Sequence, residues 1–272
     1  MEKLSKNLKK ISIVMPVRNG AQHLRRALDS LKIQNYPNLE ILACVGPSTD
    51  NTKEIFEEYG VPIAYEDDNN AADALINGYR LATGEIFGLL PHDDEILPGA
   101  LYKINSAFQD HDIEWVYSAT NSLNIDGSIH SRLGDETNIT LEMMVERNLI
   151  PTISSFFKKE TYFRVGGIRK AFPYPTDYEL WLKMLAAGIR PHKIEDDLAI
   201  FHITGLNGSM NTKETDITAP EVKKLRDIYF RKLSLTAKIR VRTRRYRTSL
   251  KPLLKKYPMV DKFLRCLHKI VK

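Results

Sequence analysis

Two adjacent carboxylates, Asp93 and Asp94, follow a short apolar run at residues 86–90 and precede a stretch at residues 97–101 that reads as the start of a helix. Loops after strands are where α/β sheets bind ligands. Paired carboxylates repel each other unless a cation lies between them. Mg²⁺ and Mn²⁺ prefer such oxygen ligands and leave positions for substrate phosphates. The alternative is a solvated acidic loop that caps the next helix.

A third carboxylate, Asp177, stands at the start of a predicted helix over residues 177–187. Leu180, Trp181 and Met184 form an apolar stripe on this helix, and Gly188 ends it. A helix N-terminus stabilises a carboxylate and fixes its position. Taken alone, Thr176 or Asp177 would be read as an ordinary helix cap.

The elements that must position these residues alternate in the first half of the chain. Apolar runs predict strands, Pro16 is expected to end the first of them, and helical spacing of apolar residues predicts the intervening helices. The strands are expected at residues 11–15, 39–45, 61–65 and 86–90, and the helices at 21–33, from about 50 to 59, and at 70–82. Such alternation predicts an α/β fold with a mostly parallel sheet flanked by helices.

The second half is less regular. Strands are expected at residues 115–118, 122–125 and 154–157, with a hairpin turn at Asp126-Gly127 leading into 128–130, and helices at 101–108, 140–147 and 160–165. Residues 198–203 are expected to form a closing edge strand.

Charge divides the chain unevenly. The formal net charge of the 272 residues is +6, yet residues 221–272 contain 18 of the 40 lysines and arginines and only three acids, so the rest is acidic. We therefore expect a polar N-terminal extension (1–10), a globular domain (11–220) and a basic helical C-terminal region (221–272). Two distant cysteines, no apolar run of about 20 residues and no signal-peptide core favour a protein that stays in the cytoplasm.

Several ordered motifs between residue 11 and about 210 resemble the family 2 glycosyltransferases, which are inverting enzymes with the GT-A, Rossmann-like fold. Their order and spacing carry the resemblance more than any one of them does. The motifs are ISIVMPVRNG, SLKIQNYPNLEI, STDNT, AADALINGYRLATGEIFGLLPHDDEILPGAL and PTDYELWLKM.

The resemblance implies roles for the three carboxylates. Asp94, and secondarily Asp93, would hold Mg²⁺ or Mn²⁺ against the diphosphate of a nucleoside-diphosphate sugar, where the metal neutralises charge on the leaving group. Asp177 would be the general base that takes the proton from the acceptor hydroxyl. His92 departs from the small or acidic residue usual in this motif and is expected to pack.

The resemblance also implies a nucleotide site. Asp73 and Asn77, one helical turn apart, match polar positions that face the nucleotide, with surface placement as the alternative. Asp50 is expected to cap its own helix and to contribute indirectly. The loop that lines the nucleotide is matched by Pro16, Val17, Arg18 and Asn19.

One departure concerns the nucleobase. The family usually places an Asp at the end of the second strand, and here the matching positions read Val45-Gly46-Pro47. These positions therefore offer no side-chain carboxylate for the recognition of uracil. Backbone groups could replace that contact, or a different base such as guanine or thymine could be used.

The basic C-terminal region predicts a partner. Residues 260–272 place their apolar side chains on one helical face and bases elsewhere, and residues 240–247 are densely basic. Such a region suits an anionic membrane surface. The alternative is a helical unit that packs on the catalytic domain. Nucleic acid is not expected, because the rest of the chain is acidic.

The resemblance to the family implies a metal-dependent, inverting glycosyltransferase that moves a sugar from a nucleoside-diphosphate sugar to a hydroxyl of a glycan or lipid-linked acceptor. The expected setting is cell-surface polysaccharide biosynthesis at the inner face of the cell membrane. The alternative is a non-catalytic nucleotide-sugar-binding or scaffold protein on the same fold.

Overall fold

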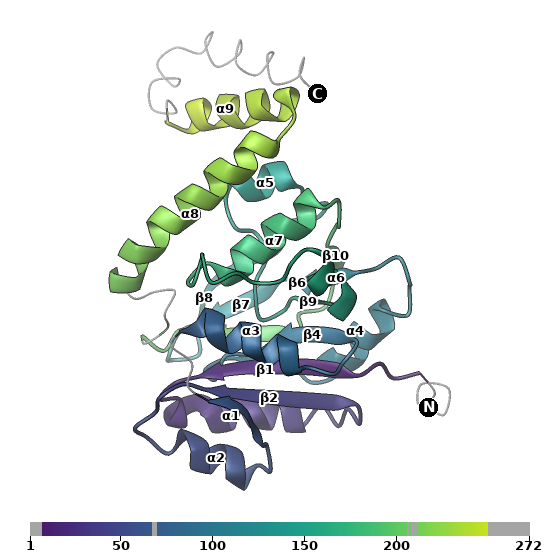
Figure 1. The fold of residues 1–272 in the computed structure, drawn as a ribbon, viewed down its shortest axis with the longest axis vertical. Coiled ribbons are helices and arrows are strands. Elements are labelled where there is room, and N and C mark those ends of the chain that lie inside the picture. The colour runs from purple at the N-terminus through teal and green to yellow at the C-terminus, as the bar shows by residue number, and fades with distance from the viewer. Residues whose placement is uncertain (1–6, 67–69, 206, 208–211, 250–272) are drawn as a thin grey trace.

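The computed structural model of the chain describes residues 7–66, 70–205, 207 and 212–249 (Figure 1). Within these residues a seven-stranded sheet has the order β10-β6-β9-β4-β1-β2-β3. Its strands are β1 (Ile11–Val17), β2 (Leu39–Val45), β3 (Ile63–Glu66), β4 (Ile86–Leu89), β6 (Trp115–Ser118), β9 (Phe156–Lys158) and β10 (His192–Ile194). Only β9 runs antiparallel to its neighbours, so the predicted, mostly parallel sheet is confirmed.

β1 pairs in parallel with β2 on one side and with β4 on the other. It continues through Pro16 to Val17, so the prediction that Pro16 ends it is wrong. The Val14 carbonyl accepts a hydrogen bond from the Leu90 N–H, on the β4 side, where β4 ends. In a parallel sheet the backbone groups of successive residues point to the two neighbouring strands in turn. The backbone of Pro16 therefore faces the β4 side, as that of Val14 does, but Val14 is the last residue of β1 that pairs with β4. The missing N–H of proline therefore breaks no ladder bond there.

Helices cover both faces of the large sheet, as the alternating pattern predicted (Figure 1). Ile11, Ile13 and Met15 of β1 pack in a core with α1, α2 and α4, whereas Val14 packs on the opposite face with α3 and α7. The helices are α1 (Ala21–Lys32), α2 (Thr52–Glu58), α3 (Ala71–Leu81), α4 (Ala100–Ala107), α5 (Leu141–Glu146), α6 (Lys159–Arg164) and α7 (Thr176–Ala186).

A smaller four-stranded sheet has the order β5-β11-β7-β8. Its strands are β5 (Glu95–Ile96), β7 (Thr120–Leu123), β8 (Ile129–Leu133) and β11 (Ala199–His202). The expected closing edge strand at residues 198–203 is therefore wrong, because β11 lies between β5 and β7. Apolar pattern cannot reveal neighbours that lie about a hundred residues away in sequence. The strands expected at 122–125 and 154–157 lie about two residues away, as β7 and β9.

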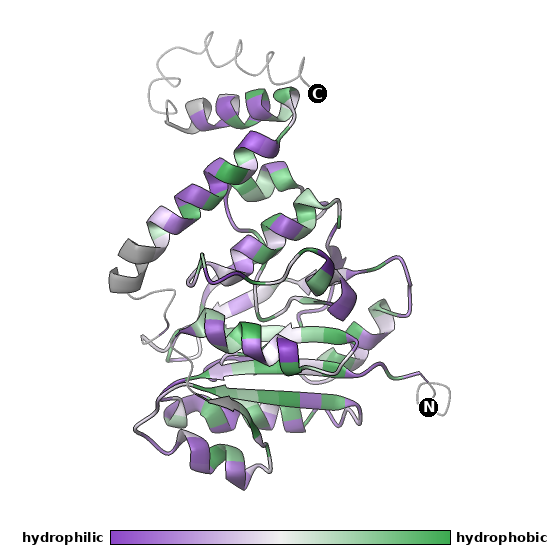
Figure 2. Cartoon of the chain, in the orientation of Figure 1, coloured by the Kyte–Doolittle hydropathy of each residue, from purple (hydrophilic) through white to green (hydrophobic). Residues whose placement is uncertain are grey.

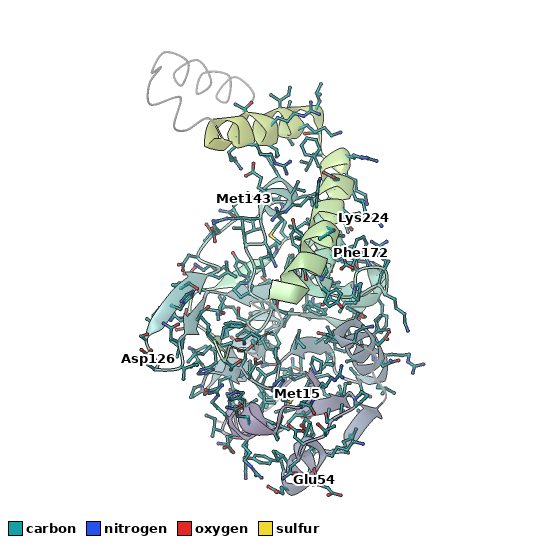
Figure 3. All side chains as sticks on the ribbon, turned by 90° about the vertical axis from the view of Figure 1, so that its left-hand side faces the viewer. Met15, Glu54, Asp126, Met143, Phe172 and Lys224 are labelled. Atoms are coloured by element: carbon teal, nitrogen blue, oxygen red, sulfur yellow. The ribbon has the colours of Figure 1, made fainter. Side chains whose placement is uncertain are left out.

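Two long helices follow, α8 (Thr212–Lys232) and α9 (Leu235–Ser249). α8 runs through Pro220, where the charge of the chain changes sign, and buries Leu225 and Tyr229 in the core that contains α7. Figure 2 shows hydrophilic and hydrophobic residues mixed along both helices. In Figure 3 Lys224 of α8 lies beside Phe172, with its ammonium group 5.5 Å from the ring centroid. The predicted amphipathic stretch at 260–272 lies outside the described residues.

None of the helices in the described part of the chain is long and apolar enough to span a bilayer.

Candidate active site

The acidic pair lies in the loop between β4 and β5, and the first and last residues of this loop, Leu90 and Asp94, are buried. Asp94 is fully buried, and Asp93 is 8% exposed. Oδ1 of Asp94 accepts a hydrogen bond of 2.9 Å from the His202 N–H, but its Oδ2 is buried without a hydrogen-bond partner among the described residues. Oδ2 of Asp93 accepts a bond of 2.9 Å from the Asn207 amide. The solvated acidic loop considered above therefore does not describe this pair.

Burial raises the pKa of Asp94 well above its usual value, and the charge of Asp93 raises it further. The His202 N–H and Arg26 act in the opposite direction but do not outweigh these effects. A cation beside Oδ2 would satisfy this atom and remove the repulsion, so the pair fits Mg²⁺ or Mn²⁺.

The described residues contain no cluster of three or more His, Cys, Asp or Glu side chains arranged to hold a metal. Mg²⁺ in nucleotide-dependent enzymes is usually bound through only one or two carboxylates, together with substrate phosphates and water.

Four side chains around the acidic pair were not predicted. Arg26 donates to the Asp93 carbonyl at 2.7 Å, and its Nε lies 3.2 Å from Glu95. Nε2 of His202 lies 2.7 Å from Oε1 of Glu95, the oxygen that Nε of Arg26 also approaches. The Asn207 amide also donates to the His202 carbonyl, at 2.8 Å. The sequence signals for this group were that Glu95 directly follows the acidic pair and that His202 stands near the end of a predicted strand.

His92 packs rather than joining the hydrogen bonds of the acidic pair. A Cβ on Gly20 would come within 2.9 Å of two of its ring carbons, so the ring lies directly against that glycine. Burial lowers the pKa of His92, although Asp93 and Asp50 act to raise it. The neutral ring is thus favoured, as the packing role expected for His92 requires.

The predicted nucleotide loop lies against the turn that follows β2. Asn19 takes a positive φ of 50°, and its N–H donates to the Ser48 hydroxyl at 3.0 Å. Its Oδ1 in turn accepts the Thr49 N–H at 2.8 Å. Pro16 and Val17 belong to β1 itself, and Arg18 is exposed. The two loops therefore form one hydrogen-bonded edge at the carboxyl ends of β1 and β2.

Asp50 connects the same two loops. Its carboxylate accepts N–H bonds from Ala21, at the start of α1, and from Thr52, at the start of α2. Burial acts to raise the pKa of Asp50, but these bonds and the Thr52 hydroxyl outweigh it, and the pKa is lowered. Asp50 thus supports α1 as well as the helix it was expected to cap.

Asp73 and Asn77 lie on α3, as predicted, but Asp73 is not a surface residue. It is 8% exposed, its N–H donates to the capping Asn70 side chain at 3.0 Å, and its Oδ1 lies 2.8 Å from Nζ of Lys170. The Asn77 amide donates to the Asp73 carbonyl at 2.9 Å. Lys170 belongs to the loop before α7, so Asp73 links α3 to that loop.

Asp177 stands in the first turn of α7, after Pro175. Its Oδ1 accepts the Tyr178 N–H at 2.6 Å, and its Oδ2 accepts bonds from the Thr152 hydroxyl and from the Asn148 amide. Burial raises the pKa of Asp177, and these hydrogen bonds reduce the rise without cancelling it. A carboxylate with a raised pKa and a fixed position can act as a proton acceptor.

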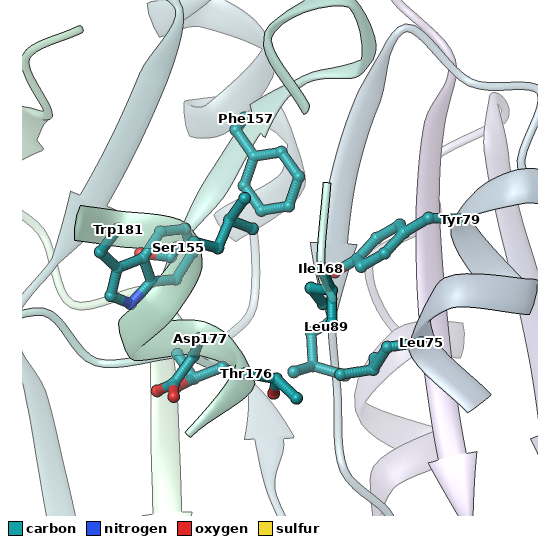
Figure 4. Close-up of a pocket in the computed structure, with 11 residues that line it drawn as sticks. Leu75, Tyr79, Leu89, Ser155, Phe157, Ile168, Thr176, Asp177 and Trp181 are labelled. Atoms are coloured by element: carbon teal, nitrogen blue, oxygen red, sulfur yellow. The ribbon is translucent and has the colours of Figure 1, made fainter. Parts of the chain in front are cut away.

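A small cavity lies between Asp177 and the end of β4, and residues of both line it (Figure 4). Leu89, the last residue of β4, and Leu75 of α3 line it together with Asp177 and Thr176. The volume that the centre of a water molecule can occupy in this cavity is about 10 Å³. The cavity can therefore hold about one water molecule but not a sugar. Asp177 therefore lies beside the strand that leads into the acidic pair.

Several known proteins with similar sequences are named as glycosyltransferases or polysaccharide synthases. An uncharacterized glycosyltransferase of Rickettsia felis is 30% identical over 188 residues, covering 64% of this chain and 31% of that protein. Another, from Rickettsia typhi, is 28% identical over 186 residues and covers 64% and 58%. The chondroitin synthase of Pasteurella multocida is 27% identical over 188 residues, covering 67% and 19%. The chain thus spans less than two thirds of the length of these relatives.

Solved structures share the fold. S. aureus TarS 1–349 in complex with UDP-GlcNAc has a TM-score of 0.68 at 17% identity, covering 89% of this chain and 73% of that chain. The mannosyltransferase PcManGT from Pyrobaculum calidifontis, in complex with GDP-Man and Mn²⁺, has a TM-score of 0.57 at 14% identity, covering 98% and 85%. The model of Glycosyl transferase family 2 matches residues 12–165, more than half of the chain. The chain therefore belongs to glycosyl transferase family 2 and has the GT-A fold.

Proposed function

We propose that this protein is a metal-dependent, inverting glycosyltransferase that moves a sugar from a nucleoside-diphosphate sugar to a hydroxyl of a glycan or lipid-linked acceptor. The observation that carries the proposal is the buried Asp94, whose Oδ2 lacks a hydrogen-bond partner among the described residues. Such an atom is unfavourable unless a ligand satisfies it. The position of Asp177, beside the strand that leads to Asp94, supplies the second group that the reaction needs.

Asp94, with Asp93 beside it, would hold Mg²⁺ or Mn²⁺. When bound, the metal would neutralise the charge that develops on the departing nucleoside diphosphate. A neighbour of this fold was solved with GDP-Man and Mn²⁺, which supports a divalent metal here. Arg26, by donating to the Asp93 carbonyl, would hold the acidic loop in place.

The remaining roles belong to the two loops and to α7. The edge formed by Arg18, Asn19 and the turn at residues 46–52 would bind the nucleotide, and Asp73 and Asn77 would face it from α3. Asp177 would accept the proton of the acceptor hydroxyl, whose oxygen attacks the anomeric carbon from the face opposite the diphosphate. The configuration at that carbon is then inverted.

The setting we propose is cell-surface polysaccharide biosynthesis, with the protein peripheral to the inner face of the cell membrane. Two relatives are named as chondroitin synthase and hyaluronan synthase, both from Pasteurella multocida, which supports a glycan acceptor. The exposed bases of α8 and α9, among them Lys223 and Arg231, support an anionic surface as partner.

The test is donor turnover across a panel of UDP-, GDP- and dTDP-sugars with Mn²⁺ or Mg²⁺, with a membrane lipid extract supplying acceptors. We expect one donor to be consumed, with complete dependence on metal. Asp94→Ala should lose both turnover and metal-dependent nucleotide binding, whereas Asp177→Asn should lose turnover but still bind nucleotide. Asp126→Asn, on the exposed β7–β8 turn, is the matched control and should leave turnover unchanged.

The alternative is a non-catalytic nucleotide-sugar-binding or scaffold protein. It is favoured by Val45-Gly46-Pro47, where the family resemblance implies an Asp that binds the nucleobase and this chain has none. Under this alternative the native protein gains thermal stability from a nucleoside diphosphate but consumes no donor from the panel. That result would remove the support for Asp177 as a base.

A further inference from the structure

We propose that Thr152, assisted by Asn148, holds Oδ2 of Asp177 and leaves Oδ1 as the atom that receives the proton of the acceptor. Both residues would be positioning residues, because they act on the base and not on the sugar. The inference rests on the proposed role of Asp177, and the experiment below separates the two.

The hydrogen bonds of the Asp177 carboxylate are distributed unequally. Oδ2 accepts two side-chain bonds, one from the Thr152 hydroxyl and one of 3.5 Å from the Asn148 amide. From other residues, Oδ1 accepts one bond, of 2.6 Å, donated by the Tyr178 N–H. An ionised carboxylate has about four acceptor positions, two on each oxygen. The position that stays open is therefore on Oδ1.

The donors come from a packed segment. Leu149 and Ile150, between Asn148 and Thr152, are buried, and Oδ1 of Asn148 accepts the Ile150 N–H at 3.3 Å. With its oxygen bonded in this way, Asn148 directs its amide N–H toward Asp177. Groups held in this way need no rearrangement when the substrate binds.

The same side of α7 is tied to α5. The Tyr178 hydroxyl donates to the Met144 carbonyl at 2.6 Å, and the Leu149 N–H lies 3.4 Å from the Met144 sulfur. Met144 thus contacts both Tyr178, the residue after the base, and Leu149, in the segment that carries Asn148 and Thr152. These two contacts with Met144 fix the two donors relative to Asp177.

Cations do not pair with Asp177 in the described part of the chain. On α7, Glu179 pairs with Arg169 and Tyr178 contacts Arg226 of α8. After α5, Arg147 pairs with Glu136. Because no ion pair favours the ionised carboxylate, that task falls to its hydrogen bonds, of which the bond from Thr152 lowers the pKa most.

The proton step follows from this arrangement. The acceptor hydroxyl donates to Oδ1, and its proton passes to that oxygen while the hydroxyl oxygen bonds to the anomeric carbon. The bond between that carbon and the diphosphate oxygen breaks, and the nucleoside diphosphate leaves with the electron pair. Oδ1 then returns the proton to water.

The test is the pH dependence of kcat in Thr152→Val, which removes the hydroxyl and keeps the shape. We expect the acid limb of the profile to move to higher pH by about one unit, because a hydrogen bond to the ionised form is lost. On that limb kcat should fall about tenfold, with KM for the donor unchanged. Thr152→Ser should restore the native profile, and Asn148→Ala should move the limb in the same direction by less.

Thr161→Val is the matched control, because Thr161 is buried and donates its hydroxyl to the Glu114 carboxylate at 2.7 Å, outside the site. It should leave the limb in place. An unmoved limb in both Thr152→Val and Asn148→Ala would overturn the inference, and melting temperatures show whether either variant is folded. If Asp177→Asn keeps full activity, the proposed function fails instead, and the assignment of Oδ1 fails with it.

Discussion

Asp94 is a residue whose placement opposes folding. It is fully buried, it lies beside another carboxylate, and one of its oxygens has no hydrogen-bond partner among the described residues. An ordinary structural position would not keep such a group, because burying an unpaired charge is unfavourable. Unfavourable groups of this kind concentrate at functional sites, where a ligand compensates for them.

We therefore predict that Asp94→Asn stabilises the protein in the absence of metal. Its amide oxygen can still accept the His202 N–H, whereas the repulsion by Asp93 is gone. The melting temperature at pH 7 should rise by roughly 2–4 °C. The same variant should lose the further stabilisation that Mn²⁺ with a nucleoside diphosphate gives the native protein.

The sign of the pH dependence follows from the raised pKa. A group whose pKa is raised by folding contributes stability below its unfolded value, about 3.9 for Asp, and loses that contribution as the pH rises through the folded value. The amount by which the melting temperature of Asp94→Asn exceeds that of the native protein should hence be large at neutral pH and disappear near pH 4. Scans from pH 4 to 8 would measure it, and a lower melting temperature at pH 7 would contradict the prediction.

At the scale of elements, α8 supports the helix that carries the proposed base. Its Leu225 is fully buried and its Tyr229 is 3% exposed, in the core that also contains Trp181 of α7. Arg226 donates to the Tyr178 hydroxyl at 3.3 Å. The helix that begins the basic region is thus part of the same packed body as α7.

Leu225→Ala should lower the free energy of unfolding by about 2–5 kcal/mol, because it removes buried methyl groups and leaves a cavity. Leu235→Ala on α9 is the matched control, since this leucine is 74% exposed, and it should change the free energy by less than about 0.5 kcal/mol. Urea denaturation would compare them. Similar values for the two variants would contradict the packing of α8.

At the scale of the whole molecule, the basic C-terminal region is partly neutralised by the domain it follows. Arg240 and Arg244 of α9 pair with Glu142 and Glu146 of α5. On another side of α9, Leu235 and Ile239 are exposed. Exposed bases close to them in sequence are Arg231 and Lys232, at the end of α8, and Arg242 of α9. One side of α9 thus packs on the protein, and another combines apolar and basic groups that would suit an anionic bilayer.

We predict that the protein co-sediments with vesicles containing phosphatidylglycerol and much less with phosphatidylcholine alone. Binding should weaken at high salt, because the charges on an exposed surface are screened. The double substitution Leu235→Ser and Ile239→Ser should reduce binding, whereas Ile129→Ser with Leu133→Ser, at exposed apolar positions of β8, should not. Equal binding to both kinds of vesicle, or no binding, would contradict the prediction. The role of the basic C-terminal region would then be to pack on the rest of the protein.

The sequence by itself determined most of the local strands and helices, and the residue types at the centre of the proposed site. Buried runs such as residues 11–15 and the helical spacing of residues 177–187 are properties of neighbouring positions, so they predict β1 and α7 directly. The acidic pair could be placed at a strand end for the same reason. The family motifs then located Asp177 as a candidate base, and the match to residues 12–165 confirms the family.

Only the tertiary structure decided which side chains meet these residues. His202 reaches Asp94 across 108 positions, Arg26 reaches Asp93 across 67, and Thr152 reaches Asp177 across 25. Periodicity reports which face of an element is apolar, but not which distant element covers that face. The contacts that set the charge and orientation of the carboxylates are long-range, and only the packing of the two sheets and their helices forms them.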